Sequence, residues 1–221
     1  MFDALFTTTT EYQKLSHALS GKGACALFGL PASGRAQVYA ALCRQLDKPL
    51  CIVTPGEAEA TRFAADLNTL GIPAAVFPAR DYVLRPIEGT AREYEYRRLA
   101  VLGELVGGRL RAVAVPAEAL TQFTTPKEDF CANTRTLHAG DTLLRDDLLA
   151  ALFGAGYTRR AQVDGPGQFS VRGDIVDIFA PDQKMPVRME FWGDEIDTLH
   201  TFDLTTPVSY TNLTLPTNYH V

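Results

Sequence analysis

The sequence predicts an α/β fold with a parallel sheet, followed by an inserted α+β domain with an antiparallel sheet. Before residue 116, nearly continuous apolar runs alternate with helical patterns, as a parallel sheet covered on both faces requires. After it, short strand patterns follow one another, separated by Gly-Asp pairs. The charge divides at the same place, because 1–116 carries 13 Lys and Arg against 11 Asp and Glu, whereas 117–221 carries 8 against 15.

The first half is expected to alternate strand and helix along the chain. Val38, Leu42 and Leu46 recur in steps of four, which predicts a helix. Gly71 ends the next helical pattern, and Pro116 closes the last strand pattern. The expected strands are 24–28, 50–54, 74–77 and 112–115, and the expected helices are 35–46, 57–70 and 92–105.

The second half is expected to hold one helix and a series of short strands. Asp141 is the predicted N-cap, the apolar face contains Leu144, Leu148, Leu149 and Leu152, and Gly154 and Gly156 end the helix. The pairs Gly173-Asp174 and Gly193-Asp194 suit tight hairpin turns that need a positive φ. The expected strands are 157–163, 168–172, 175–179, 187–192 and 196–202.

The composition excludes several classes of protein. With 46% apolar and 21% charged residues, the chain is globular rather than disordered. It contains no run of about 18 apolar residues and no signal-peptide pattern, so we expect a cytoplasmic protein with no membrane partner. Its four cysteines and four histidines match no metal-binding spacing, and no metal site is expected. A net charge of −5 disfavours general phosphate binding.

A glycine-containing loop follows the first predicted strand at the position of a Walker A phosphate loop. Gly29 and Gly34 have the required spacing, but Arg35 stands in place of the lysine and Ala36 in place of the hydroxyl residue that holds magnesium. The loop is either a degenerate nucleotide site in a P-loop-NTPase-like domain or an ordinary turn between strand and helix. Neither interpretation predicts ATP hydrolysis or a bound cofactor. The Phe191–Glu195 stretch imitates Walker B, but its glycine favours a hairpin.

Seven arginines lie between residues 80 and 111, interleaved with three tyrosines. Basic residues can bind nucleic-acid phosphates, and the aromatic residues among them can stack on bases. Acidic residues share the segment, and Glu93 is placed to pair with Arg97 at i+4. A DNA-contacting surface and a salt-bridged, solvated helix therefore both remain open.

The most specific motif runs from Pro166 to Phe179, PGQFSVRGDIVDIF, and continues in PVRMEFWGDEID at 186–197. It resembles the second domain of the bacterial transcription-repair coupling factors, the Mfd family, and of the related excision-repair subunit UvrB. The strand pattern places Phe169, Val171, Ile175 and Ile178 on core faces and Arg172, Asp174 and Asp177 outward.

The resemblance implies a function. UvrB-like proteins carry a complete Walker A sequence, whereas the Mfd family has lost it here, so Gly34-Arg35-Ala36 favours the Mfd family. A nonenzymatic N-terminal module that recruits UvrA in transcription-coupled repair is then expected. RNA polymerase, DNA, ATP and magnesium would be bound by parts outside these 221 residues. The alternative is a fragment of a UvrB-type ATP-dependent helicase subunit.

The resemblance also indicates which residues contact UvrA. They are the exposed groups of the motif, with Arg172 foremost: Arg159, Arg160, Arg172, Arg188, Glu190 and Phe191. Arginines and exposed aromatics commonly anchor protein interfaces. The alternative places Phe191 in the core and pairs Glu190 with a neighbouring strand.

Three segments are expected overall. Residues 1–116 form the degenerate P-loop-like domain, which is expected to be incomplete, and 117–206 form the UvrA-docking domain. Residues 207–221 contain no charged residue and are rich in threonine. They resemble translated adapter sequence and are expected to be a non-native tail, with a divergent linker as the alternative.

Overall fold

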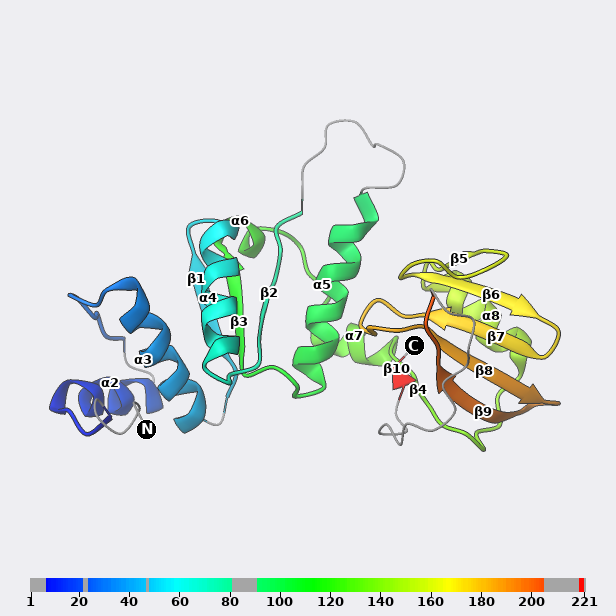
Figure 1. Cartoon of the computed structure of the whole chain (residues 1–221), viewed down its shortest axis with the longest axis horizontal. Helices are drawn as coiled ribbons and strands as arrows, with labels where there is room; N and C mark the ends of the chain where they lie inside the picture. The colour runs from blue at the N-terminus through cyan, green and yellow to red at the C-terminus, as the bar shows by residue number, and fades with distance from the viewer. Residues whose placement is uncertain (1–6, 22–23, 47, 81–90, 205–218, 221) are drawn as a thin grey trace. The chain divides into compact units, whose positions relative to one another are not determined.

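The computed structural model describes residues 7–21, 24–46, 48–80, 91–204 and 219–220, and the chain divides into two compact units (Figure 1). Unit 1 comprises Met1–Tyr94 and Val101–Phe123, and unit 2 comprises Glu95–Ala100 and Thr124–Val221. The helices are α2 Thr10–Ser20, α3 Ala32–Gln45, α4 Glu57–Thr69, α5 Ala91–Val106, α6 Ala117–Leu120, α7 Lys127–Ala132 and α8 Arg145–Gly154. The strands are β1 Leu50–Thr54, β2 Ala74–Val76, β3 Ala112–Pro116, β4 Thr136–Leu137, β5 Thr158–Arg159, β6 Gln168–Arg172, β7 Ile175–Phe179, β8 Val187–Trp192, β9 Glu195–Thr201 and β10 Tyr219–His220.

Unit 1 contains a three-stranded parallel sheet in the order β1-β3-β2. All five residues of the central strand β3 are buried, as expected for a strand between two neighbours. Helix α4 lies against this sheet (Figure 1) and contributes Ala60 and Ala64, which pack on Ala114 of β3. Gly71 has φ 75° after α4, which confirms the predicted helix end. The parallel α/β prediction for this half is therefore confirmed for these three strands.

The predicted strand at 24–28 is wrong. Residues 24–28 belong to no strand and are all exposed, with Phe28 at 88%. A buried strand needs a neighbour for its backbone N–H and C=O groups. In the described part of the chain, β1 pairs only with β3, and residues 24–28 do not pair with its other edge.

Unit 2 contains a five-stranded sheet in the order β5-β6-β7-β8-β9. Pairs from β6 to β9 are antiparallel, but β5 pairs with β6 in parallel, so the sheet is mixed rather than wholly antiparallel. The parallel pair arises because β5 reaches β6 through a loop and not a tight hairpin. Gly173 has φ 60° and Gly193 has φ 64° at the two predicted hairpin turns, which confirms both.

The core of unit 2 lies between α8 and one face of its sheet. Leu148 and Leu152 of α8 pack against Phe169, Ile178 and other strand residues. The predicted core face is correct for Phe169, Val171 and Ile178 but wrong for Ile175, because Val176 pairs with Val171 and takes that place.

The predicted N-cap of the helix in unit 2 is also wrong. Leu144, not Asp141, occupies the N-cap position of α8. The Asp141 carboxylate instead accepts a hydrogen bond from the backbone N–H of His138 at 2.7 Å. Its side chain is therefore committed to the preceding turn.

The predicted non-native tail, 207–221, lies mostly outside the described residues. Within it, Tyr219–His220 form β10, which pairs antiparallel with β4. No described helix has the length and apolar character needed to cross a bilayer.

Candidate functional site

The face of the unit 2 sheet opposite α8 carries polar side chains. Because successive strand residues point to opposite faces, Ser170 and Arg172 share this face, opposite the core residues Phe169 and Val171. Strand pairing continues the row across three more strands, since Ser170 is paired with Asp177, Asp177 with Arg188, and Arg188 with His200. We call this surface the polar face.

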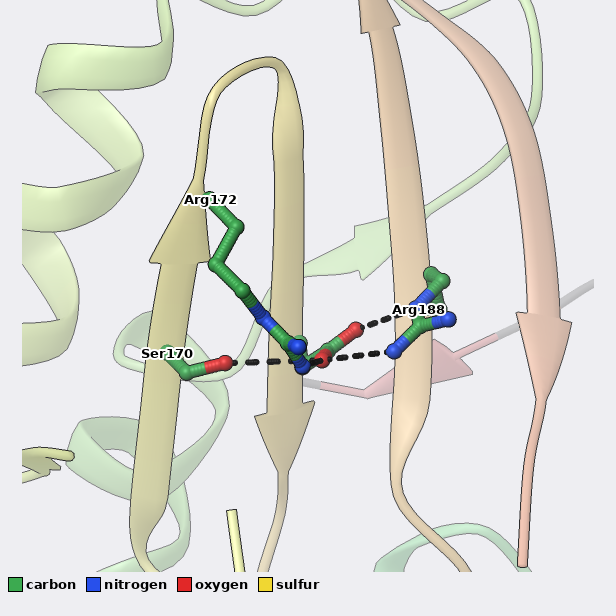
Figure 2. A network of polar contacts seen from close by, with 4 residues as sticks. Ser170, Arg172 and Arg188 are labelled. Carbon is green, nitrogen blue, oxygen red and sulfur yellow. Dashed lines mark hydrogen bonds and ion pairs between the residues drawn. The ribbon is translucent and has the colours of Figure 1, made fainter. Parts of the chain in front are cut away.

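A buried carboxylate lies at the centre of the polar face (Figure 2). Arg188 donates two hydrogen bonds to Asp177, from Nε to Oδ1 at 2.6 Å and from Nη2 to Oδ2 at 2.9 Å. Arg172 donates from Nη2 to Oδ2 at 3.0 Å, and the Ser170 hydroxyl donates to the same oxygen at 3.4 Å. Asp177 lies on the outward face predicted for it, opposite the core, but its side chain is only 1% exposed because neighbouring side chains cover it. Two arginines from neighbouring strands cover it.

Arg188 and Arg172 differ in their exposure and in the number of hydrogen bonds that they donate to Asp177. Arg188 is 20% exposed, forms a bidentate pair with Asp177, and its guanidinium carbon lies 4.8 Å from the centroid of the Phe202 ring. The hydrogen bond to Asp177 is the main cause that raises the pKa of Arg188 above its ordinary value. Arg172 is 55% exposed and contacts Asp177 through one nitrogen. One carboxylate between two guanidinium groups leaves the network with a net charge of +1.

The other predicted contact residues are spread around unit 2. Arg159 is exposed in β5 and Arg160 is exposed just after it. Glu190 is half-buried on the polar face, paired with Ile175 and Thr198. The structure therefore brings Arg172, Arg188 and Glu190 together on one face, whereas Arg159 lies in β5 and Arg160 just after it.

Phe191 is not a surface residue. It is 6% exposed and belongs to the core cluster with Met189 and Ile196. The reason is the strand alternation, because Arg188 and Glu190 on one face place Phe191 on the other. Its proposed role as an exposed anchor is corrected to a core role.

Sequence analysis missed Trp192, which the structure leaves 82% exposed. It follows Phe191 at the end of β8 and so belongs to the same strand face as Arg188 and Glu190. Backbone hydrogen bonds fix this end of the sheet, from Phe191 N to Asp174 O at 2.8 Å and from Leu143 N to Asp194 O at 2.7 Å. An exposed tryptophan on a rigid hairpin is a common interface anchor.

The glycine-containing loop of unit 1 does not have the geometry of a phosphate cradle. Helix α3 already begins at Ala32, and the backbone N–H of Arg35 donates to the Pro31 carbonyl at 3.1 Å. Pro31 has no N–H at all. Ala36 is 3% exposed and packs inside, while Arg35 is exposed. Gly29 has φ 80°, in the left-handed region that favours glycine.

The arginine-rich stretch divides into residues with different surroundings. Arg98 is 8% exposed and donates to Thr124 Oγ1 at 2.8 Å, and Arg111 donates to the carbonyl of Cys43 at the end of α3. Arg80, Arg97 and Arg109 are exposed. Arg85 and the side chains of Arg92 and Glu93 lie outside the described part of the chain. Arg98 and Arg111 of this stretch therefore have contacts within the protein.

No group of three or more metal-ligating side chains occurs among the described residues. Comparison with known proteins gives a class for unit 2 instead. Residues 136–217, which include all of β6–β9, match the family described as the UvrB interaction domain. Unit 2 is thus similar to an interaction domain found in DNA repair proteins.

The chain as a whole is homologous to the N-terminal region of transcription-repair-coupling factors. It is 35% identical to that of Mycobacterium tuberculosis (strain CDC 1551 / Oshkosh) over 208 residues, 90% of this chain. It is 29% identical to that of Bacillus subtilis over 179 residues, 80% of this chain. The UvrABC system protein B of Chlorobium limicola is 28% identical over 193 residues.

The chain spans only a small part of these relatives. It covers 17% of the Mycobacterium protein, 15% of the Bacillus protein and 28% of the Chlorobium protein. Activities of the whole relatives are therefore proposals for this chain.

Proposed function

We propose that this chain is a nonenzymatic module of a transcription-coupled repair factor and that unit 2 docks the excision-repair protein UvrA. The observation that carries the proposal is Arg172, an exposed guanidinium held on the polar face of a UvrB interaction domain. In the parent protein, other domains would bind RNA polymerase and move along DNA with ATP and magnesium. The repair context also supports a cytoplasmic location.

The proposed docking surface combines Arg172 with Trp192. An arginine offers planar, bidentate recognition of a carboxylate, and a rigid tryptophan buries a large area at little cost in entropy. Both residue types are enriched among the few that dominate interface energetics. The surface is therefore expected to take a protein partner that presents a carboxylate beside an apolar contact.

Arg172→Ala and Trp192→Ala should each weaken the binding of purified UvrA to the full 221-residue chain. We expect the Kd to rise about 30-fold for each, equivalent to about 2 kcal/mol. Calorimetric titration or surface plasmon resonance measures this. Neither side chain is buried, so the midpoint of thermal unfolding should change little.

The matched control is Arg135→Ala. Arg135 is an exposed arginine of unit 2 that lies outside the strands β6–β9 of the polar face. The affinity of this variant should equal that of the unaltered chain. The proposal is refuted by a chain that shows no measurable association with UvrA. Equal losses for Arg135→Ala and Arg172→Ala would indicate only unspecific charge attraction.

We propose that the chain binds no nucleotide. The hydroxyl and lysine of a Walker A loop are replaced by Ala36 and Arg35, and the engaged N–H of Arg35 supports this. Millimolar Mg-ATP should therefore leave the thermal unfolding midpoint of the full chain unchanged, because a ligand that binds the folded state must raise it.

The alternative is that the chain is a fragment of a UvrB-type ATP-dependent helicase subunit. The similarity to UvrABC system protein B supports this alternative. The alternative predicts the opposite outcome in the same experiment. A rise of the midpoint with Mg-ATP, abolished by Gly34→Val, would favour it over the proposed nonenzymatic module.

A further inference from the structure

The polar face contains a buried charge that the docking proposal does not use. Asp177 is 1% exposed, and it is held by two arginines that are themselves unequal, at 20% and 55% exposure. Both Oδ atoms are engaged by Arg188, and Oδ2 is shared with Arg172 (Figure 2). A buried carboxylate persists only when it is paired and hydrogen-bonded.

We infer that Asp177 is a positioning residue that orients Arg172 toward a carboxylate of the partner, while Arg188 serves only to hold Asp177. The inference rests on the proposed function, since it assigns roles within the same docking surface. It gives different roles to two arginines that the resemblance indicates alike as UvrA contacts.

Arg188 has little capacity for a partner. Its Nε and Nη2 both donate to Asp177, and its guanidinium is packed near the Phe202 ring. Strand pairing places Arg188 directly beside Asp177, on the adjacent strand. The two charges therefore form a nearly neutral, internally satisfied pair.

Arg172 has N–H groups that Asp177 does not engage and that can donate to a partner. A guanidinium has five N–H donors, and Asp177 engages one nitrogen of Arg172. Arg172 is the last residue of β6 and reaches across to Asp177 of β7, which restricts the rotamers of a long side chain. A side chain ordered before binding loses less entropy when the partner carboxylate arrives.

The first test is the order of the arginine side chains in the unaltered chain, free in solution. Nitrogen-15 relaxation of the arginine Nε–Hε groups should show Arg172 more ordered than the exposed Arg135. In Asp177→Asn, Arg172 should become as mobile as Arg135. This measurement needs no partner, and it is made on variants whose folded fraction is checked by circular dichroism.

The second test is UvrA binding by Asp177→Asn, Arg172→Ala and the double variant, each with its folded fraction measured by circular dichroism. Asp177→Asn should raise the Kd about 3- to 10-fold through faster dissociation, without a slower association rate. In the Arg172→Ala background, Asp177→Asn should have no further effect.

The two ideas fail in different ways. If Arg172 is as mobile as Arg135 in the unaltered chain, or if Asp177→Asn weakens binding equally with and without Arg172, Asp177 is not a positioning residue. If Arg172→Ala leaves UvrA affinity unchanged, the proposed docking surface is wrong, whatever the relaxation data show.

Discussion

Arg188→Ala should lower the free energy of unfolding of unit 2 by about 3 to 5 kcal/mol, the range for removing one partner of a buried ion pair. The substitution takes two charge-assisted hydrogen bonds from a carboxylate that is 1% exposed. Arg172 and Ser170 remain, but each contributes a single bond to Asp177. Chemical denaturation monitored by circular dichroism measures the loss.

Two further variants test whether the loss in Arg188→Ala comes from the buried carboxylate of Asp177. Arg172→Ala removes a half-exposed partner and should cost about 1 kcal/mol or less. Asp177→Ala combined with Arg188→Ala removes the buried carboxylate that has lost its bidentate partner, so the double variant should be more stable than Arg188→Ala alone. If Arg172→Ala costs as much as Arg188→Ala, the two arginines have equal structural roles and the division between them is wrong.

The pH dependence of this pair follows from the direction of its shift. The hydrogen bond to Asp177 raises the pKa of Arg188 in the folded state. The stability gained from a raised pKa is present below the unfolded-state pKa and is lost only as pH rises through the folded-state pKa. For an arginine this lies far above neutrality, so the contribution of Arg188 persists across the ordinary working range.

Period-two alternation was enough to predict most of the unit 2 strands and the faces of several residues. The same rule applied to β8 would have placed Arg188 and Glu190 on one face and Phe191 on the other, in the core, but the resemblance groups the three together as exposed residues of the motif. Period-two alternation could not predict the burial of Asp177. That burial depends on the register of three strands, which brings two arginines over one carboxylate.

Unit 1 illustrates a second limit of local patterns. Residues 24–28 have the composition of a buried strand, and so do 50–54, yet only the latter pairs with a neighbour. Apolar character shows that a segment favours burial. Whether a partner strand is available depends on segments distant in sequence, which no local window contains.

Gly167 occupies a position where both the backbone and a neighbouring ring exclude a side chain. Its φ is 72°, and an added Cβ would overlap the hydroxyl end of the Tyr96 ring of α5, which would have to move. The backbone cannot easily adjust, because its N–H donates to Phe179 O at 2.7 Å and its C=O accepts from Thr158 N at 2.9 Å. Within unit 2, this glycine therefore joins three elements: the α5 segment Glu95–Ala100, β5 and β7.

Gly167→Ala should thus destabilise unit 2 by about 2 to 4 kcal/mol, of which about 1 to 2 kcal/mol comes from the left-handed φ. Chemical denaturation of the full chain measures it. Tyr96→Ala in the Gly167→Ala background makes room for the new methyl group, and it should recover the steric part but not the backbone part. Gly193→Ala, with φ 64° and open space around its Cβ position, is the matched control and should cost only the backbone part. Equal losses at Gly167 and Gly193 would show that Tyr96 does not restrict this position, because the loss at Gly193 contains only the backbone part.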